Sequence, residues 1–431
     1  MNQKQQKPTL TGQRIKTRKR DEKEKYDPLG FRDAIFKGLN EAGNDLEQAY
    51  KFLDSAGGRL DYRRYTETLL DILLAGGILA PGGSIVGDVD KTKPFRSSLC
   101  VFTCEENLDA VRNFSQIFTN LIRRYKYMEK KLEDEMLKVL MFLKAFSPSE
   151  RTKLSMVTSI FLAKGHIPAS CLNSLFNEVL VKEGISLEFV LTLFKVWLDE
   201  KDMSSISAAL RKAQLEKKLM LFLPVSKQTL PHFQQLFTDA GLKSIVEYQK
   251  NVQESDFRKE LQTTIINMMN EGAPSKDIVD FGKEYMVSSK KPEQEVITLI
   301  WKSIMNAVEW NKKEELVGDQ VAKHLKRYSD ILTEFTTQAK SEMTLLLKVQ
   351  DYCYEYSQFR KWFQRMVVLL YKTDVLSEEV IVLWYKEAHS TKGKSFFLEQ
   401  MKKFVEWLEN AEEESESEDE EEEEDEEEEG G

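Results

Sequence analysis

Two tryptophans near the C-terminus lie among carboxylates, and these residue types are well suited to binding chemistry. Trp384 ends the stretch SEEVIVLW, and Trp407 lies between Glu406 and Glu409 in FVEWLENAEEE. Carboxylates form charge-assisted hydrogen bonds with lysine and arginine, and the face of an indole ring attracts the same cations. The pattern therefore predicts non-covalent binding of a lysine-rich partner.

The first tryptophan belongs to a predicted helix that begins with two acidic residues. Ser377 is predicted to cap this helix, and Glu378 and Glu379 follow in the first turn, where the helix dipole favours anions. Trp384 lies at helical spacing from apolar residues on both sides. The sequence leaves open whether Trp384 is a core residue or a partner contact.

The second tryptophan lies beside an apolar stripe on the last predicted helix. Four residues at three- and four-residue spacing form this core-facing stripe: Phe397, Met401, Phe404 and Leu408. The helix closes with Glu412, Glu413 and Glu414, and anions at a helix C-terminus oppose the dipole by roughly 0.3–1 kcal/mol each. Helix stability does not explain these glutamates, so we interpret them as part of a binding surface.

The acidic run continues beyond this helix and contains two serines. There are 16 acidic residues and no basic ones between Glu412 and Glu429. Ser415 and Ser417 each have an acidic residue three positions later, which is the pattern read by acidophilic kinases, and phosphorylation would deepen the negative field. Beyond Ser417 the run predicts only long-range attraction of cations.

The sequence lacks the motifs of a catalytic, metal or cofactor site. Cys100 and Cys104 form C-x3-C, but no second pair of cysteines or histidines completes four zinc ligands. The glycine-rich stretch GGILAPGG is not followed by the Lys-Ser/Thr pair of a phosphate-binding loop. We therefore expect no enzyme activity, no metal and no cofactor.

The elements that must position these residues are predicted to be helices throughout, from Tyr26 to about Asn410. Apolar residues recur at three- and four-residue spacing in YKYMEKKLEDEMLKVLMFLKAF, and the next helix opens with a capping box of Ser147, Pro148 and Glu150. Medium helices with short connections predict stacked antiparallel pairs. The fold class is therefore all-α, with two HEAT-like helical-repeat domains.

Charge and polarity divide the chain into four parts. Residues 1–25 carry nine basic and three acidic residues and are predicted to be a disordered basic arm. Two helical domains follow, at 26–240 and 250–412, with a boundary marked by the polar stretch KNVQESDFRKELQ. Residues 413–431 are predicted to be a disordered acidic tail, so the two ends carry opposite charges.

No segment predicts a membrane protein or a secreted one. No apolar run approaches the roughly 18 residues needed to span a bilayer, and the N-terminus lacks the apolar core of a signal peptide. The four cysteines are too few for a disulfide framework, which favours a reducing compartment. We expect the protein to be cytoplasmic, with the nucleus left open.

A competing interpretation comes from four leucines spaced seven apart after the basic stretch RIKTRKR, which imitate a DNA-binding leucine zipper: Leu39, Leu46, Leu53 and Leu60. Glycines at 43, 57 and 58 interrupt the supposed helix, and Asp27-Pro28 separates it from the basic stretch. We therefore predict that the leucines form the core of two short helices and expect no specific DNA binding. A zipper-type transcriptional regulator remains the alternative. The arm itself could contact RNA phosphates, carry a nuclear address or be a solvated tail.

Two stretches resemble the aromatic–acidic boxes of the W2 domain, which ends translation initiation factor five and the epsilon subunit of the factor-two guanine exchanger. They are YKTDVLSEEVIVLW and FVEWLENAEEE, and their tryptophans match the two that give the domain its name. From PTLTGQRIKTRKRDEKEKYDP through MNAVEWNKKEELV to the tail, the chain resembles the basic leucine zipper and W2 domain-containing proteins, or initiation-factor-five mimics.

The resemblance implies a non-catalytic regulator of translation initiation. Members of this family are expected to bind the lysine blocks of the beta subunit of translation initiation factor two and the translation initiation factor three complex. They would thereby act on the small ribosomal subunit preinitiation complex, compete with initiation factor five and raise the stringency of start-codon selection. The resemblance also implies that 26–240 is a HEAT domain of the MIF4G class and that 250–412 is a W2 domain.

The resemblance assigns partner contacts residue by residue. Box one supplies Asp374, Glu378, Glu379 and Trp384, and box two supplies Glu406, Trp407, Glu409, Glu412, Glu413 and Glu414. The chain departs from its relatives in box one, where Ser377 replaces an acidic residue and Tyr385-Lys386 follows the tryptophan. It also lacks the zinc-binding, arginine-bearing module of initiation factor five, which implies binding without stimulated GTP hydrolysis.

Overall fold

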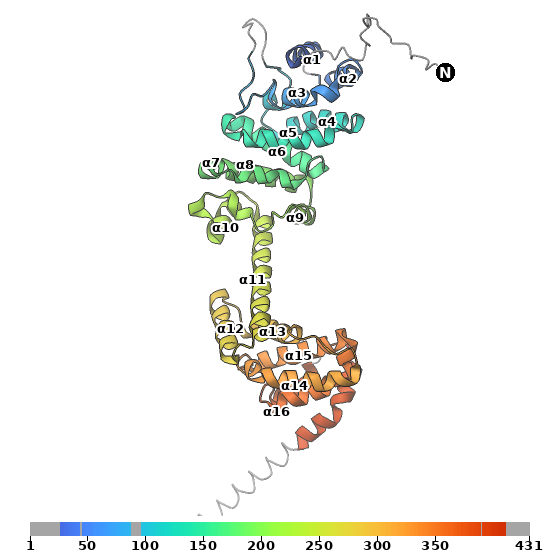
Figure 1. The fold of residues 1–431 in the computed structure, drawn as a ribbon, viewed down its shortest axis with the longest axis vertical. Helices are drawn as coiled ribbons and strands as arrows, with labels where there is room; N and C mark the ends of the chain where they lie inside the picture. The colour runs from blue at the N-terminus through green and yellow to red at the C-terminus, as the bar shows by residue number, and fades with distance from the viewer. Residues whose placement is uncertain (1–25, 44, 88–95, 389, 411–431) are drawn as a thin grey trace, which may run out of the picture. The chain divides into compact units, whose positions relative to one another are not determined.

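The computed structural model describes residues 26–43, 45–87, 96–388 and 390–410, and these residues are mainly helical (Figure 1). The described part contains no strand, and its β-type pairing is an isolated antiparallel bridge between Leu79 and Ile85. The predicted all-α fold class is therefore confirmed. The chain divides into two compact units, Met1–Val252 and Gln253–Gly431.

Helices of the first unit lie in successive layers, and most of them pack against helices one or two places away in sequence (Figure 1). Their bounds are α1 (Pro28–Ala42), α2 (Leu46–Ala56), α3 (Tyr62–Ala75), α4 (Leu108–Arg124), α5 (Met128–Met141), α6 (Pro148–Lys164), α7 (Glu178–Lys182), α8 (Ile185–Glu200), α9 (Met203–Lys212) and α10 (Leu230–Asp239). Contacts between neighbours are typical of helical repeats.

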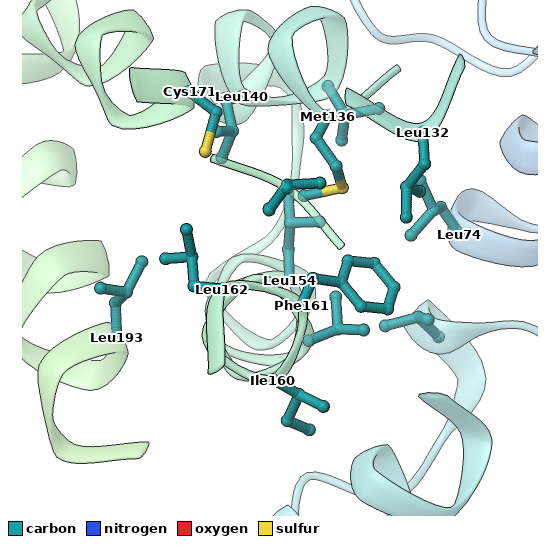
Figure 2. Packing of buried hydrophobic residues seen from close by; sticks show 14 of the residues in the cluster. Leu74, Leu132, Met136, Leu140, Leu154, Ile160, Phe161, Leu162, Cys171 and Leu193 are labelled. Atoms are coloured by element: carbon teal, nitrogen blue, oxygen red, sulfur yellow. The ribbon is translucent and has the colours of Figure 1, made fainter. Parts of the chain in front are cut away.

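The core of this unit forms where the predicted apolar stripe of α5 meets α6. Figure 2 shows Met136 and Leu140 of α5 pointing toward Leu154 and Phe161 of α6, and all four side chains are buried. Helix α6 begins with the predicted capping box. The backbone N–H of Glu150 donates to Ser147 Oγ at 3.3 Å, and Glu150 Oε2 accepts from the backbone N–H of Ser147 at 2.9 Å.

The four evenly spaced leucines do not share one helix, so the zipper interpretation is wrong. Helix α1 ends at Gly43, whose φ of 61° lies in the left-handed region that glycine adopts without strain. Leu39 and Leu53 are buried in the core from two separate helices, and Leu60 lies in the turn after α2. The prediction of two short helices therefore holds for Leu39, Leu46 and Leu53, whereas Leu60 is partly buried and packs against the core from the turn.

Helix α11 (Lys243–Glu271) runs without interruption through the polar stretch predicted to mark the domain boundary. The second unit continues with α12 (Ser275–Ser289), α13 (Glu293–Asn306), α14 (Glu314–Thr333), α15 (Ala339–Glu355), α16 (Phe363–Lys372), α17 (Glu378–Leu383), a π-helical turn (Trp384–Ala388) and a C-terminal helix over 394–410. The last five of these elements position the predicted partner contacts.

Candidate functional site

Most of the predicted contacts lie on one region of the second unit. We call this region the acidic–aromatic surface and define it by Tyr371, Asp374, Glu378, Glu379, Phe404, Glu406, Trp407 and Glu409. Trp384 lies apart from this surface, and five other predicted residues lie outside the described part of the chain: Glu412, Glu413, Glu414, Ser415 and Ser417. Their assigned roles therefore stay predictions.

Box one begins in the turn between α16 and α17. Asp374 is exposed and has a φ of 55°, a left-handed conformation that aspartate tolerates better than most residues. The next two residues, Val375 and Leu376, are buried and anchor the turn to the core. Their burial fixes where α17 starts and leaves Asp374 facing solvent.

Ser377 occupies the N-cap position of α17, but its side chain does not make the predicted capping bond. Its hydroxyl and its backbone N–H instead both donate to Glu342 Oε2 of α15, at 2.7 and 2.6 Å. The local capping prediction is therefore wrong for the side chain. A carboxylate from a neighbouring helix holds the start of α17 in place.

The two glutamates that follow differ in exposure. Glu379 is exposed, whereas Glu378 is partly buried and its Oε2 accepts a hydrogen bond from the Tyr371 hydroxyl at 3.4 Å. Burial, followed by the charge of the adjacent Glu378, raises the pKa of Tyr371 above its ordinary value. The tyrosine therefore stays protonated and keeps donating to this carboxylate at neutral pH.

Trp384 is a core residue, so the interpretation of its side chain as a partner contact is corrected. The indole is fully buried, and its Nε1–H donates to Gln350 Oε1 at 3.0 Å. The ring of Phe363 lies 5.4 Å from it, centroid to centroid. Trp384 therefore belongs to the core of the second unit, and a partner cannot reach it in this structure.

Gln350 of α15 is a positioning residue that the sequence analysis missed. Besides accepting from Trp384, its Oε1 accepts from the backbone N–H of Ser390 at 3.1 Å, and its Nε2 donates to the carbonyls of Ser390 and Lys392 at 3.0 and 2.9 Å. It thereby fixes the chain after the π-helical turn. A glutamine between Leu346 and Cys353, on an otherwise apolar helix face, was the available signal.

The π-helical turn presents Lys386 to the second box. Lys386 Nζ lies 2.8 Å from Glu409 Oε1 in an ion pair between two partly exposed side chains. Lys386 belongs to the Tyr385-Lys386 pair that the resemblance to the W2 domain marks as a departure in box one. Such a surface pair contributes about 0–1 kcal/mol, so a lysine of a partner can replace it.

Box two displays Trp407 on the C-terminal helix, at the edge of the apolar stripe as predicted. The indole is 54% exposed and stacks on Phe404 with ring centroids 5.9 Å apart and planes 14° apart. Its edge meets Tyr371 at 6.4 Å. Phe404 is only partly buried, and the predicted core position belongs to Val405, which is 1% exposed.

Two links join the boxes into one surface. Tyr371 contacts Trp407 through its ring and Glu378 through its hydroxyl, and Lys386 pairs with Glu409 across the same region. The exposed indole therefore lies close to carboxylates from both boxes. This arrangement can hold a lysine or arginine by cation–π contact and charge pairing together.

Three further features of the described residues concern metal binding, membrane insertion and thiol reactivity. Within the ranges that the structure describes, no cluster of three or more histidine, cysteine or acidic residues could hold a metal ion. None of the described helices is long and apolar enough to cross a membrane. Burial raises the pKa of the Cys104 thiol to about 11, which keeps it protonated and unreactive at neutral pH.

Two family models match the chain. One, described as the 5MP1/2 HEAT domain, matches residues 15–259, and the other, the W2 domain described as eIF4-gamma/eIF5/eIF2-epsilon, matches residues 341–418. The second match includes every predicted partner contact and both serines.

Relatives match over nearly the whole length. The chain is 58% identical over 414 residues to eIF5-mimic protein 2 of Gallus gallus, covering 96% of this chain and 98% of the relative. It is 57% identical over 413 residues to eIF5-mimic protein 2 of Homo sapiens, covering 96% and 97%. It is also 57% identical over 411 residues to eIF5-mimic protein 1 of Mus musculus, covering 95% and 98%.

Proposed function

The chain belongs to the eIF5-mimic protein family, and from this premise we propose that its acidic–aromatic surface captures lysine-rich segments of initiation factors. It is a regulator of translation initiation that carries a W2 domain. The partners we propose are the lysine blocks of the beta subunit of translation initiation factor two and the translation initiation factor three complex. The site of action would be the small ribosomal subunit preinitiation complex in the cytoplasm.

The proposed mechanism is competition without catalysis. By occupying the basic segments that initiation factor five also needs, the protein would lower the amount of that factor at the preinitiation complex. Start-codon selection would then become more stringent. The proposed activity is binding alone, without stimulated GTP hydrolysis.

One observation carries the proposal, namely the exposed Trp407 indole, which contacts a tyrosine that is hydrogen-bonded to a carboxylate of another helix. Tyr371 joins the ring to Glu378, and Glu409 follows on the same helix as the indole. A lysine that lies over the ring would be on the same surface as these carboxylates, and it could replace Lys386 as the partner of Glu409. Successive lysines of a basic segment can therefore be bound by ring and carboxylates together.

The test measures binding of a labelled lysine-block peptide to the full chain by fluorescence anisotropy. We expect the affinity to fall steeply as salt rises, because exposed charges are screened. Trp407→Ala should weaken binding about two- to tenfold, and charge reversal of Glu412, Glu413 and Glu414 should weaken it further. Phe396→Ala is the matched control, since this exposed ring lies on the same helix outside the surface.

Two results would contradict the proposal. One is binding that does not change with salt, and the other is equal weakening by Phe396→Ala and Trp407→Ala. Circular dichroism of each variant establishes that the helices remain folded. A pull-down from cytosolic extract then identifies which factor the peptide-binding surface retains.

A further inference from the structure

Six aromatic rings form a continuous chain at the start of the first unit. In order of contact they are Tyr26, Tyr65, Phe31, Tyr62, Tyr125 and Tyr127, with successive ring centroids 4.8–6.0 Å apart. They come from the start of the described chain at Tyr26 and α1, from α3, and from the turn between α4 and α5. Three regions that are separated in sequence therefore converge on one aromatic row.

The outermost ring at one end is a supported and accessible platform. Tyr26 is 56% exposed and stacks on Tyr65 with centroids 5.2 Å apart and planes 11° apart. The Tyr65 hydroxyl accepts from the backbone N–H of Asp27 at 2.9 Å, which ties the two residues together. The guanidinium carbon of Arg64 lies 5.4 Å from the centre of the Tyr26 ring.

A second guanidinium lies at the other end of the row. The guanidinium carbon of Arg63 is 5.1 Å from the ring centre of Tyr127, and the side chains of Arg59 and Lys126 are exposed. We call Tyr26, Arg59, Arg63, Arg64, Lys126 and Tyr127 the aromatic–arginine surface. It combines flat rings with cations at both ends.

Nearby carboxylates are engaged within the protein. Asp27 Oδ1 accepts from the backbone N–H of Gly30 at 2.9 Å, and Asp61 Oδ1 accepts from that of Arg64 at 3.2 Å, so both cap helices. Glu67 pairs with Lys138 at 3.2 Å. Four exposed cations of the aromatic–arginine surface, at positions 59, 63, 64 and 126, therefore stand against two capping aspartates and a glutamate that is already paired.

We propose that the aromatic–arginine surface binds single-stranded RNA. Unpaired bases offer a flat face to exposed rings and guanidinium planes, and the phosphates offer negative charge to the arginines and the lysine of the surface. An acidic protein segment would satisfy the cations but would leave the Tyr26 platform unused. RNA is the nucleic acid that a regulator of translation initiation meets.

The test uses the full chain and a labelled, unstructured CA-repeat RNA of about 20 nucleotides, with binding followed by fluorescence anisotropy. We expect Tyr26→Ala to weaken binding roughly five- to tenfold and Tyr26→Phe to retain it, because stacking needs the ring and not the hydroxyl. Arg63→Ala with Arg64→Ala should also reduce the slope of log affinity against log salt, by about 0.7 for each phosphate that the variant no longer neutralises.

A matched control is available in the second unit, where the guanidinium of Arg360 lies 5.6 Å from the ring centre of the exposed Tyr354. Tyr354→Ala with Arg360→Ala should leave RNA affinity within about twofold. Equal weakening by this pair, full retention by Tyr26→Ala, or no RNA binding by the unaltered chain would each overturn the proposal.

Two further probes separate this surface from a merely basic one. A duplex of mixed sequence and the same length should bind at least about tenfold more weakly, because its bases are not free to stack. A peptide with the sequence of residues 412–429 stands for an acidic protein partner. If the surface bound this peptide through Arg63 and Arg64 while ignoring RNA, its ligand would be acidic protein and the RNA proposal would be wrong.

Discussion

The two units each display an exposed aromatic ring beside charged groups, and the charges have opposite signs. In the first unit, Tyr26 stacks on Tyr65 with Arg64 beside the pair. In the second, Trp407 is linked to Glu378 through one intervening ring. The same aromatic chemistry is therefore presented in two electrostatic settings.

This difference assigns complementary partners to the two surfaces. Where the protein supplies the cation and the ring, a partner must bring anions and a second flat group, which nucleic acid does. Where the protein supplies anions and the ring, a partner must bring cations, which a lysine-rich segment does. The ring gives affinity in both cases, and the neighbouring charge selects the class of ligand.

The largest expected effect is the difference in stability between replacing the buried tryptophan and replacing the exposed one. Trp384→Ala should lower the free energy of unfolding of the second unit by about 3–5 kcal/mol, because it removes a fully buried ring from the core. Trp407→Ala should change it by less than about 1 kcal/mol, because that ring is exposed. Urea unfolding of the full chain, followed by circular dichroism, measures both. Comparable losses would contradict the assignment of Trp384 to the core and Trp407 to the surface.

These two tryptophans also show how far sequence can predict this molecule. Both lie at helical spacing beside apolar residues, and the sequence could not tell which one is buried. The answer depends on Gln350, which is 34 positions from Trp384 and lies on another helix. Helix periodicity is a local property, whereas the packing of one helix on another is not.

The two predicted helix caps make the same point. The capping box of Ser147 and Glu150 forms as predicted, because both partners lie within one turn. Ser377 has a similar local setting, but its hydroxyl and its backbone N–H both donate to Glu342, which lies 35 positions earlier in the sequence. The row of rings at Tyr26 was missed for this reason, since its stacking partner lies 39 positions later in sequence.

A charge reversal should separate the ligands of the two surfaces. Replacing Glu379 and Glu406 by lysine removes two exposed anions from the acidic–aromatic surface. We expect affinity for the lysine-block peptide to fall roughly 5- to 30-fold, from about 0.5–1 kcal/mol at each position. RNA affinity should not decrease, and Arg63→Ala with Arg64→Ala should give the reverse pattern. If either variant weakened both ligands equally, the two surfaces would not be independent.

Carboxylates inside the first unit behave differently from those exposed on the second. Glu135 of α5 is 3% exposed, and burial, followed by the adjacent carboxylate of Asp71, raises the pKa of Glu135 well above its ordinary value. The folded chain therefore binds a proton more tightly than the unfolded chain. Stability from this group is present below the unfolded pKa and is lost as pH rises toward the folded one.

Because the pKa of Glu135 is raised in the folded chain, replacing this carboxyl by a group that cannot ionise should stabilise the protein more at high pH than at low pH. Glu135→Gln keeps the shape and a hydrogen-bond donor but cannot ionise. The free energy of unfolding of the variant, minus that of the unaltered chain, should therefore be about 1 kcal/mol higher at pH 8 than at pH 5. Thermal unfolding at the two pH values measures the difference. Glu379→Gln, at an exposed site, should show no such trend. An equal change at both pH values would mean that Glu135 ionises as an ordinary carboxylate.

The smallest expected effect concerns the ion pair between Lys386 and Glu409. Lys386→Gln should change the free energy of unfolding by less than about 1 kcal/mol, because both side chains are partly exposed. It also removes an internal competitor for Glu409, so affinity for the lysine-block peptide should rise about two- to fivefold at low salt. The gain should shrink as salt rises, because screening weakens both the internal pair and its replacement.

Lys372→Gln is the control for this last effect, since it removes the same charge from an exposed lysine at the end of α16. A specific competitor predicts a larger gain at Lys386 than at Lys372, whereas a general change in net charge predicts equal gains. Equal gains would leave Lys386 as an ordinary surface residue. A larger gain at Lys386 would mean that Lys386 lowers the affinity of the acidic–aromatic surface for lysine. The charge of this one residue beside the aromatic rings would then set how tightly the surface binds a basic partner.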